Sequence, residues 1–193
     1  MTADRRRRWA RRIANTFTAT RGAITLMILL EAKRAPAEAV RRVTLLTLAG
    51  WTTDVIDGKL GRFSRLPGGI WARLDFPLDM AMAWATGWVF SVWGYYPQDA
   101  YLGYALLAAV ATLFRPNRTT VMAFSAPVSA LPLWVSWLAD PRVGLAYVVW
   151  VIAVLCLDWR RFWGVVASFI AGLPPRPRDY FLRSLRRWLK EAE

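Results

Sequence analysis

The chain alternates long, uncharged apolar runs with short polar segments. The run Thr119–Ala139 holds 21 residues without a charge, and Met80–Gln98 holds 19. A helix that crosses a membrane needs about 20 mainly apolar residues, and a soluble core of this size does not require uncharged runs of such length and number. The pattern therefore predicts an integral membrane protein built from helices.

Six apolar segments are separated by loops that contain proline, glycine or charged residues, which interrupt helices. We expect an all-α bundle of six transmembrane helices that forms one domain over residues 1–193. The expected spans are residues 15–32, 37–62, 71–95, 100–114, 119–138 and 143–158, and the last could continue to Ile170.

Basic residues concentrate at both ends of the chain. Residues 1–13 contain six arginines around Trp9 and Ile13, and residues 179–193 repeat apolar side chains at helical spacing between arginines. Both patterns are typical of amphipathic helices on a membrane surface. We therefore expect a basic surface segment at each end of the bundle.

The chain carries 26 Lys and Arg residues against 13 Asp and Glu residues, so its formal net charge is +13. Nucleic acid and anionic lipid headgroups both attract such an excess. Because the arginines flank apolar segments, we expect the lipid bilayer as a partner and no nucleic acid. With the N-terminus inside, most of the basic residues fall on the cytoplasmic side, which predicts a multi-pass protein of the cell (inner) membrane.

Two residue types that often carry catalysis are nearly absent. There is no histidine, and Cys156 is the only cysteine. Histidine therefore cannot serve as a base or metal ligand, and neither an intrachain disulfide nor a cysteine-rich metal site can form. If this chain is an enzyme, we expect carboxylates and metal ions to carry the chemistry.

Four of the acidic residues fall within a stretch of 26 residues, at the edges of apolar segments: Asp54, Asp57, Asp75 and Asp79. On a helix, residues three apart lie about 60° from each other around the axis and residues four apart about 40°, so each pair shares one face. An isolated pair is most often a solvated helix end. Two facing pairs would form a cage of four carboxylates, which is costly near a membrane unless cations such as Mg²⁺ or Mn²⁺ neutralise it.

This stretch resembles the signature of the CDP-alcohol phosphotransferase family, D-x-x-D-G-x-x-A-R-x8-G-x3-D-x3-D. The four aspartates match in register, as do Gly58 and Arg62, whereas Gly61 replaces an alanine and Trp71 replaces a glycine. Pro77, between the last two aspartates, is not part of the signature. We expect it in the first turn of its helix, where a missing N–H costs little.

The resemblance implies a membrane enzyme of phospholipid biosynthesis. Such an enzyme transfers a phosphatidyl group from CDP-diacylglycerol to a small alcohol and releases CMP, with its active site on the cytoplasmic side. Glycerol 3-phosphate is the favoured acceptor, and inositol phosphate or another alcohol stays open. A homodimer also stays open.

The resemblance also implies roles for the motif residues. Asp54, Asp57, Asp75 and Asp79 would hold two Mg²⁺ or Mn²⁺ ions. Asp79 would in addition act as the general base for the acceptor hydroxyl. Gly58 and Gly61 would face cytidine, and Arg62 the diphosphate.

Further arginines are candidates for binding phosphate. Arg21 ends a stretch similar to the N-x-x-T-x-x-R pattern of the family and would contact the CDP-lipid, unless its side chain snorkels to the headgroups. A phosphorylated acceptor would need other cytoplasmic arginines. The candidates are Arg115, Arg118, Arg160 and Arg161, although the positive-inside rule alone explains their presence.

Two other classes of protein stay open. Trp71 makes a catalytically impaired membrane protein of the same fold one alternative, although we expect this side chain to point away from the nucleotide. Prenyltransferases also bind magnesium diphosphate through aspartates on helices. They typically separate their motifs by far more than the 17 residues between Asp57 and Asp75, which disfavours this class.

Overall fold

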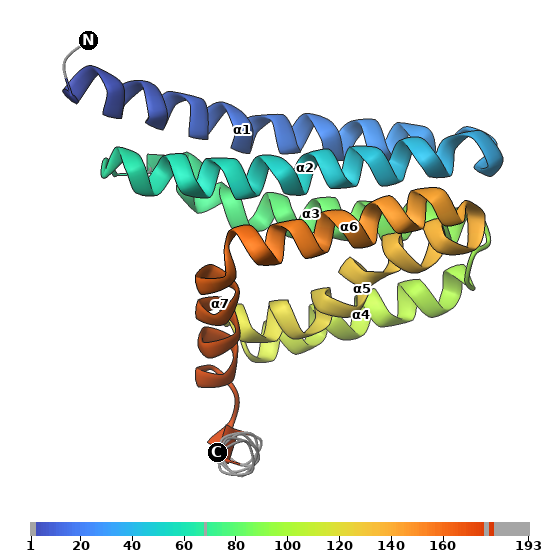
Figure 1. The fold of residues 1–193 in the computed structure, drawn as a ribbon. Coiled ribbons are helices and arrows are strands. Elements are labelled where there is room, and N and C mark those ends of the chain that lie inside the picture. The colour runs from blue at the N-terminus through green and yellow to red at the C-terminus, as the bar shows by residue number, and fades with distance from the viewer. Residues whose placement is uncertain (1–2, 68, 176–177, 180–193) are drawn as a thin grey trace, which may run out of the picture.

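The computed structural model describes residues 3–67, 69–175 and 178–179, and in these ranges the chain forms helices and no strands (Figure 1). The all-α expectation is therefore confirmed for the described part of the chain. The helices are α1 (Ala3–Glu31), α2 (Pro36–Ser64), α3 (Gly69–Val92), α4 (Gln98–Phe114), α5 (Arg118–Ala139), α6 (Pro141–Leu157) and α7 (Trp159–Ala171).

Helices α1 to α6 lie side by side, and short turns reverse the chain between them (Figure 1). α1 packs most extensively on α2 and α3, while α5 packs on α3 and α6. Because α2 and α3 form a hairpin, the end of α2 and the start of α3 lie at the same end of the bundle. The hairpin thus brings the two aspartate pairs of the sequence motif next to each other.

The turn between α2 and α3 depends on unusual backbone angles. Arg65, which follows α2, has a φ of 54°, and Gly69 at the start of α3 has a φ of 59°. A left-handed residue commonly ends a helix, and glycine adopts such a φ without strain. The hydroxyl of Ser64 donates to the carbonyl of Gly61 at 2.7 Å and accepts from the backbone N–H of Leu66 at 3.3 Å. These bonds end α2 close to the motif.

The main apolar core lies among α1, α2, α3 and α5. Its fully buried members include Ile28, Val43, Val89, Phe90 and Val135. The outward surface is also apolar, with Leu113 81% and Phe114 84% exposed on α4. Exposed apolar surface on this scale is typical of a protein that contacts lipid or a partner.

Two helices, α1 and α5, are each long and apolar enough to cross a membrane, and α6 with α7 would count as a third span if the bent pair were one span. A membrane protein is therefore supported at this coarser level. Six spans stay a prediction.

Several details differ from the expectations. α1 is continuous from Ala3, so the basic residues before Ile13 form its first turns and not a separate surface segment. The expected continuation of the sixth span to Ile170 is wrong, because the chain bends by 85° between α6 and α7. Pro77 lies inside α3 and not in its first turn. Apart from Asp179, the expected C-terminal surface helix lies outside the described residues.

The contact between α5 and α6 offers a test of the packing. A Cβ on Gly144 of α6 would lie 2.8 Å from the Cα of Trp137 in α5, and backbone cannot move aside cheaply. We expect Gly144→Ala to lower the free energy of unfolding by about 1–3 kcal/mol, the usual cost of overpacking. Thermal unfolding in detergent micelles measures this change.

Gly103→Ala is the matched control, since a Cβ on Gly103 of α4 would meet nothing within 4 Å. Alanine is a better helix former than glycine by about 1 kcal/mol, so this variant should be neutral or slightly stabilised. Equal behaviour of the two variants would contradict the close approach of α5 and α6.

Candidate functional site

Arg21 of α1 lies at the centre of the four motif aspartates. Its side chain is fully buried, and its Nη1 contacts Asp79 and lies 3.5 Å from Oδ1 of Asp54. Its Nη2 contacts Asp57 and Asp75. The structure therefore gathers all four aspartates around one guanidinium, and the snorkelling interpretation of Arg21 is wrong.

Thr18, one turn before Arg21, supports this arrangement. Its hydroxyl lies 3.2 Å from Oδ2 of Asp57 and 3.4 Å from Nη2 of Arg21. A buried charge is tolerated when it is paired and hydrogen-bonded. Thr18 and the carboxylates provide such partners for the two terminal nitrogens of Arg21.

The cluster has more negative than positive charge. Four carboxylates and one guanidinium sum to a formal charge of −3, and Asp57 is only 5% exposed. Asp54, Asp57 and Asp75 each offer one carboxylate oxygen, and these atoms lie within 4.8 Å of one another. Carboxylate oxygens are the ligands that Mg²⁺ and Mn²⁺ prefer, so the donor set and the excess negative charge fit a divalent cation.

Two cavities border the aspartates from different sides. A cavity of about 210 Å³ between α1, α2 and α3 has Asp57 and Asp75 in its wall; we call it the glycine cavity. Its other lining residues are Arg11, Ala14, Asn15, Thr18, Gly58, Gly61, Arg62 and Ala72. A mainly apolar cavity of about 410 Å³ between α2, α3, α5, α6 and Val165 of α7 has Asp54 and Asp79 in its wall. Its other lining residues include Trp51, Met80, Trp150, Val151 and Leu155. The aspartates thus separate a polar chamber from an apolar one.

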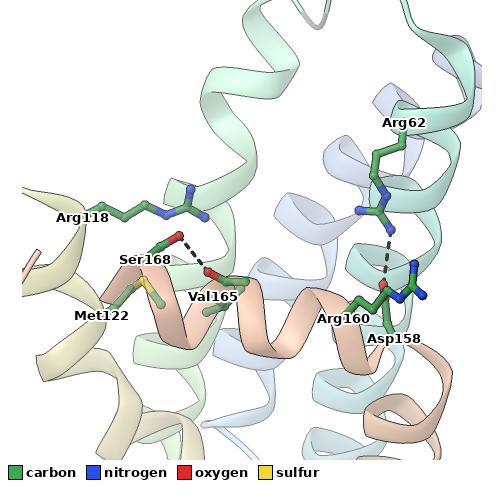
Figure 2. A pocket seen from close by; sticks show the side chains of 8 residues that line it. Arg62, Arg118, Met122, Asp158, Arg160, Val165 and Ser168 are labelled. Carbon is green, nitrogen blue, oxygen red and sulfur yellow. Dashed lines mark hydrogen bonds and ion pairs between the residues drawn. The ribbon is translucent and has the colours of Figure 1, made fainter. Parts of the chain in front are cut away.

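A third cavity, of about 510 Å³, lies at the same end of the bundle and contains three arginines; we call it the arginine cavity (Figure 2). Arg62, Arg118 and Arg160 line it together with Asp158, which lies 3.3 Å from Arg62. Its other lining residues are Met122, Gly164, Val165 and Ser168. Arg62 also lines the glycine cavity, so the two chambers adjoin.

The four arginines expected to bind the acceptor differ in whether they line the arginine cavity. Arg118 and Arg160 line the arginine cavity, and the guanidinium of Arg118 lies 4.7 Å from the centre of the Phe76 ring. Arg115 is exposed and does not line this cavity. The side chain of Arg161 lies outside the described part of the structure.

Sequence reasoning missed Arg11. We assigned it to the membrane surface, but it lines the glycine cavity, and its Nε is buried with no hydrogen-bond partner. A Cβ on Gly61 would lie 3.4 Å from Nη1 of Arg11. The signal was available, because Arg11, Asn15 and Thr18 recur at helical spacing on one face of α1.

Trp71 is half-buried, and among the described residues it is not one that lines the glycine cavity, whereas its neighbour Ala72 is. This agrees with a side chain that points away from the cavity, and the effect of Trp71 on activity stays a prediction.

No protein-family model, curated protein or solved structure matches this chain. The family resemblance therefore rests on the motif residues of the sequence alone.

The ion cluster can be tested by removing its cation. We expect Arg21→Gln to lower the free energy of unfolding by about 3 kcal/mol, because four carboxylates then lack their shared partner. This value is the lower end for breaking a buried pair, since Asp54, Asp75 and Asp79 are partly exposed. Thermal unfolding in micelles with a chelator present measures the change.

Arg34→Gln is the control, because Arg34 is exposed and pairs with Glu31 at 3.3 Å; it should cost less than about 1 kcal/mol. Adding Asp57→Asn to Arg21→Gln removes one repelling charge and should recover part of the loss. If this double variant were less stable than Arg21→Gln, the charge argument would fail.

Proposed function

We propose that this protein is a membrane phosphotransferase of the CDP-alcohol type. It transfers a phosphatidyl group from CDP-diacylglycerol to a small alcohol, with glycerol 3-phosphate favoured, and releases CMP on the cytoplasmic side of the cell membrane. One observation carries the proposal. The aspartate cluster stands between a polar, glycine-lined cavity and an apolar cavity, which matches a donor that has a nucleotide at one end and acyl chains at the other.

The donor fits these chambers in one orientation. The acyl chains need an apolar environment, which the cavity beside Asp54 and Asp79 provides. The nucleotide would then enter the opposite cavity, where Gly58 and Gly61 let a flat ring approach the backbone of α2. The diphosphate between these parts would lie beside the aspartates, and the guanidinium of Arg62 could contact its oxygens.

A diphosphate beside four carboxylates requires positive charge. Asp54, Asp57 and Asp75 would hold Mg²⁺ or Mn²⁺, with Asp79 as a further ligand, and metal ions held there would stabilise negative charge on the attacking and leaving oxygens. Arg21 would then give up part of its contact with the carboxylates. Its guanidinium would stay nearby as a fixed donor to phosphate oxygens.

The transfer step needs an activated hydroxyl. The acceptor oxygen forms a bond to the phosphorus that carries diacylglycerol, and the bond from this phosphorus to the bridging oxygen breaks. CMP leaves with that oxygen, and the hydroxyl proton passes to Asp79. The phosphate of the acceptor would lie in the arginine cavity, where Arg118 and Arg160 supply positive charge close to the donor site.

One observation favours a second candidate. The guanidinium of Arg21 already contacts all four aspartates. In a catalytically impaired protein of the same fold, this arginine would take the place of metal ions permanently. The two candidates differ in whether the purified protein releases CMP.

The first test is turnover by the purified protein in micelles that contain CDP-diacylglycerol, Mg²⁺ and a panel of alcohols. We expect metal-dependent release of CMP that stops when EDTA removes the metal. We expect Asp79→Asn to lower single-turnover CMP release by about 10²–10⁴-fold, the usual contribution of a general base. The same variant should lose less affinity for CDP-diacylglycerol than Asp54→Asn or Asp57→Asn.

Normal turnover by Asp79→Asn would rule out this residue as the base. Undiminished binding of CDP-diacylglycerol by both the Asp54 and Asp57 variants would overturn the metal cage. If the wild-type protein releases no CMP with any acceptor, the impaired protein is the correct candidate.

The second test concerns the acceptor. We expect Arg118→Gln and Arg160→Gln each to raise the KM for a phosphorylated acceptor by about 10- to 100-fold, because a hydrogen bond to a charged group contributes about 1.5–3 kcal/mol. The KM for CDP-diacylglycerol should change little. Arg115→Gln is the control with the same charge change outside the cavity. Equal effects of all three variants would show that only the general positive charge matters.

A further inference from the structure

Helix α7 lies across the end of the bundle. The chain bends by 85° after α6, so α7 runs nearly at right angles to the other helices (Figure 1). It begins beside α2, where Asp158 pairs with Arg62. It ends against α5, where a Cβ on Gly172 would lie 1.8 Å from Oγ1 of Thr119. If the bundle crosses the bilayer, α7 runs parallel to the membrane plane.

Two faces of α7 differ in chemistry. Arg160, Gly164 and Ser168 recur every four residues and line the arginine cavity, so this small and polar face turns toward Arg62 and Arg118 (Figure 2). At 100° per residue, the opposite face contains only apolar side chains. They are Trp159, Phe162, Trp163, Val165, Val166, Phe169 and Ile170, of which Val165 at the edge also lines the arginine cavity.

The start of the apolar face is uncovered, whereas Val166, Phe169 and Ile170 further along it are half-buried. Trp159 is 53%, Trp163 47% and Phe162 39% exposed. Among the described helices, only α5 and α6 pack on α7. A patch of large aromatic side chains with this exposure needs an apolar environment.

We propose that this face of α7 is embedded in the headgroup–acyl boundary of the bilayer, on the side where the aspartate cluster lies. With 13 residues, α7 is about 20 Å long, too short for a hydrocarbon core of about 30 Å. Tryptophan is enriched at this boundary, and interfacial helices bury their apolar face about 5–10 Å deep. Arg160 on the other face lies at the level of anionic headgroups.

This placement makes the membrane part of the arginine cavity. One wall of that cavity is the polar face of α7, and the residues that flank α7 contact α2 through Asp158 and α5 through Gly172. The bilayer would then hold α7, and with it this wall of the arginine cavity, in position through contacts with the apolar face of the helix. The inference does not depend on the enzymatic activity, and its test does not use it.

The experiment is spin-label depth measurement on the full chain in phosphatidylglycerol–phosphatidylcholine vesicles. Single cysteines for nitroxide labels replace Phe162, Phe169 or Ser168 in a Cys156→Ser background. Phe162 and Phe169 lie on the same face and about 10 Å apart along the helix. We expect both labels at the same shallow depth, about 5–10 Å below the headgroups, with more access to oxygen than to a water-soluble nickel chelate. The label at Ser168 should be more accessible to the nickel chelate than to oxygen.

Two results would overturn the proposal. A depth that changes by about 10 Å between the labels at 162 and 169 would make α7 the second half of a bent span. Free access of the nickel chelate to both labels would place α7 in water. Trp163→Cys and Ile170→Cys form an equivalent pair if either phenylalanine variant fails to fold.

Discussion

The buried contact between one arginine and four aspartates is the constraint on which the rest of this structure depends. Arg21 comes from α1, one pair of carboxylates from α2 and the other from α3, so a single charge cluster ties three helices together. Each member would be costly alone in an apolar bundle, because a buried charge needs a partner. The cluster therefore fixes the relative register of α1, α2 and α3. It also leaves an excess of negative charge at one point, and the proposed chemistry needs such an excess.

The surrounding chambers follow from the same hairpin. α2 and α3 present their carboxylates toward α1. On this side, Gly58 and Gly61 have no side chains to fill the space beside α2, which leaves a polar cavity. On the other side, Trp51 of α2 and Trp150 of α6 meet with ring centres 6.1 Å apart and help to shape the apolar cavity. The cavity on one side of the aspartates is polar and the cavity on the other side is apolar, because different helices line them. A substrate with one polar and one apolar end can use both chambers at once.

Local sequence patterns predicted the helices and the aspartate cluster, but not the contacts between distant segments. The all-α class and the pairing of carboxylates on shared faces follow from spacing alone, which is a property of each helix. The end of the sixth span near residue 158 was predicted, but a continuation to Ile170 stayed open because the residues on either side of Asp158, Arg160 and Arg161 are apolar. The cavity position of Arg11 was missed because its basic neighbours suggested a membrane surface. Which of several arginines lines a cavity depends on how helices pack, and no periodicity along one helix contains that information.

Arg62 lines both the glycine cavity and the arginine cavity, and its guanidinium pairs with Asp158 at the bend between α6 and α7. A ligand that attracts this group into one chamber withdraws it from the other. Occupancies of the two chambers are then linked, and the linkage must be the same in both directions. A nucleotide and an acceptor analogue would each alter the other's dissociation constant by one common factor, and a factor of one would exclude this coupling. Competition for this one side chain would make the coupling negative, so that each ligand would bind more weakly while the other is bound.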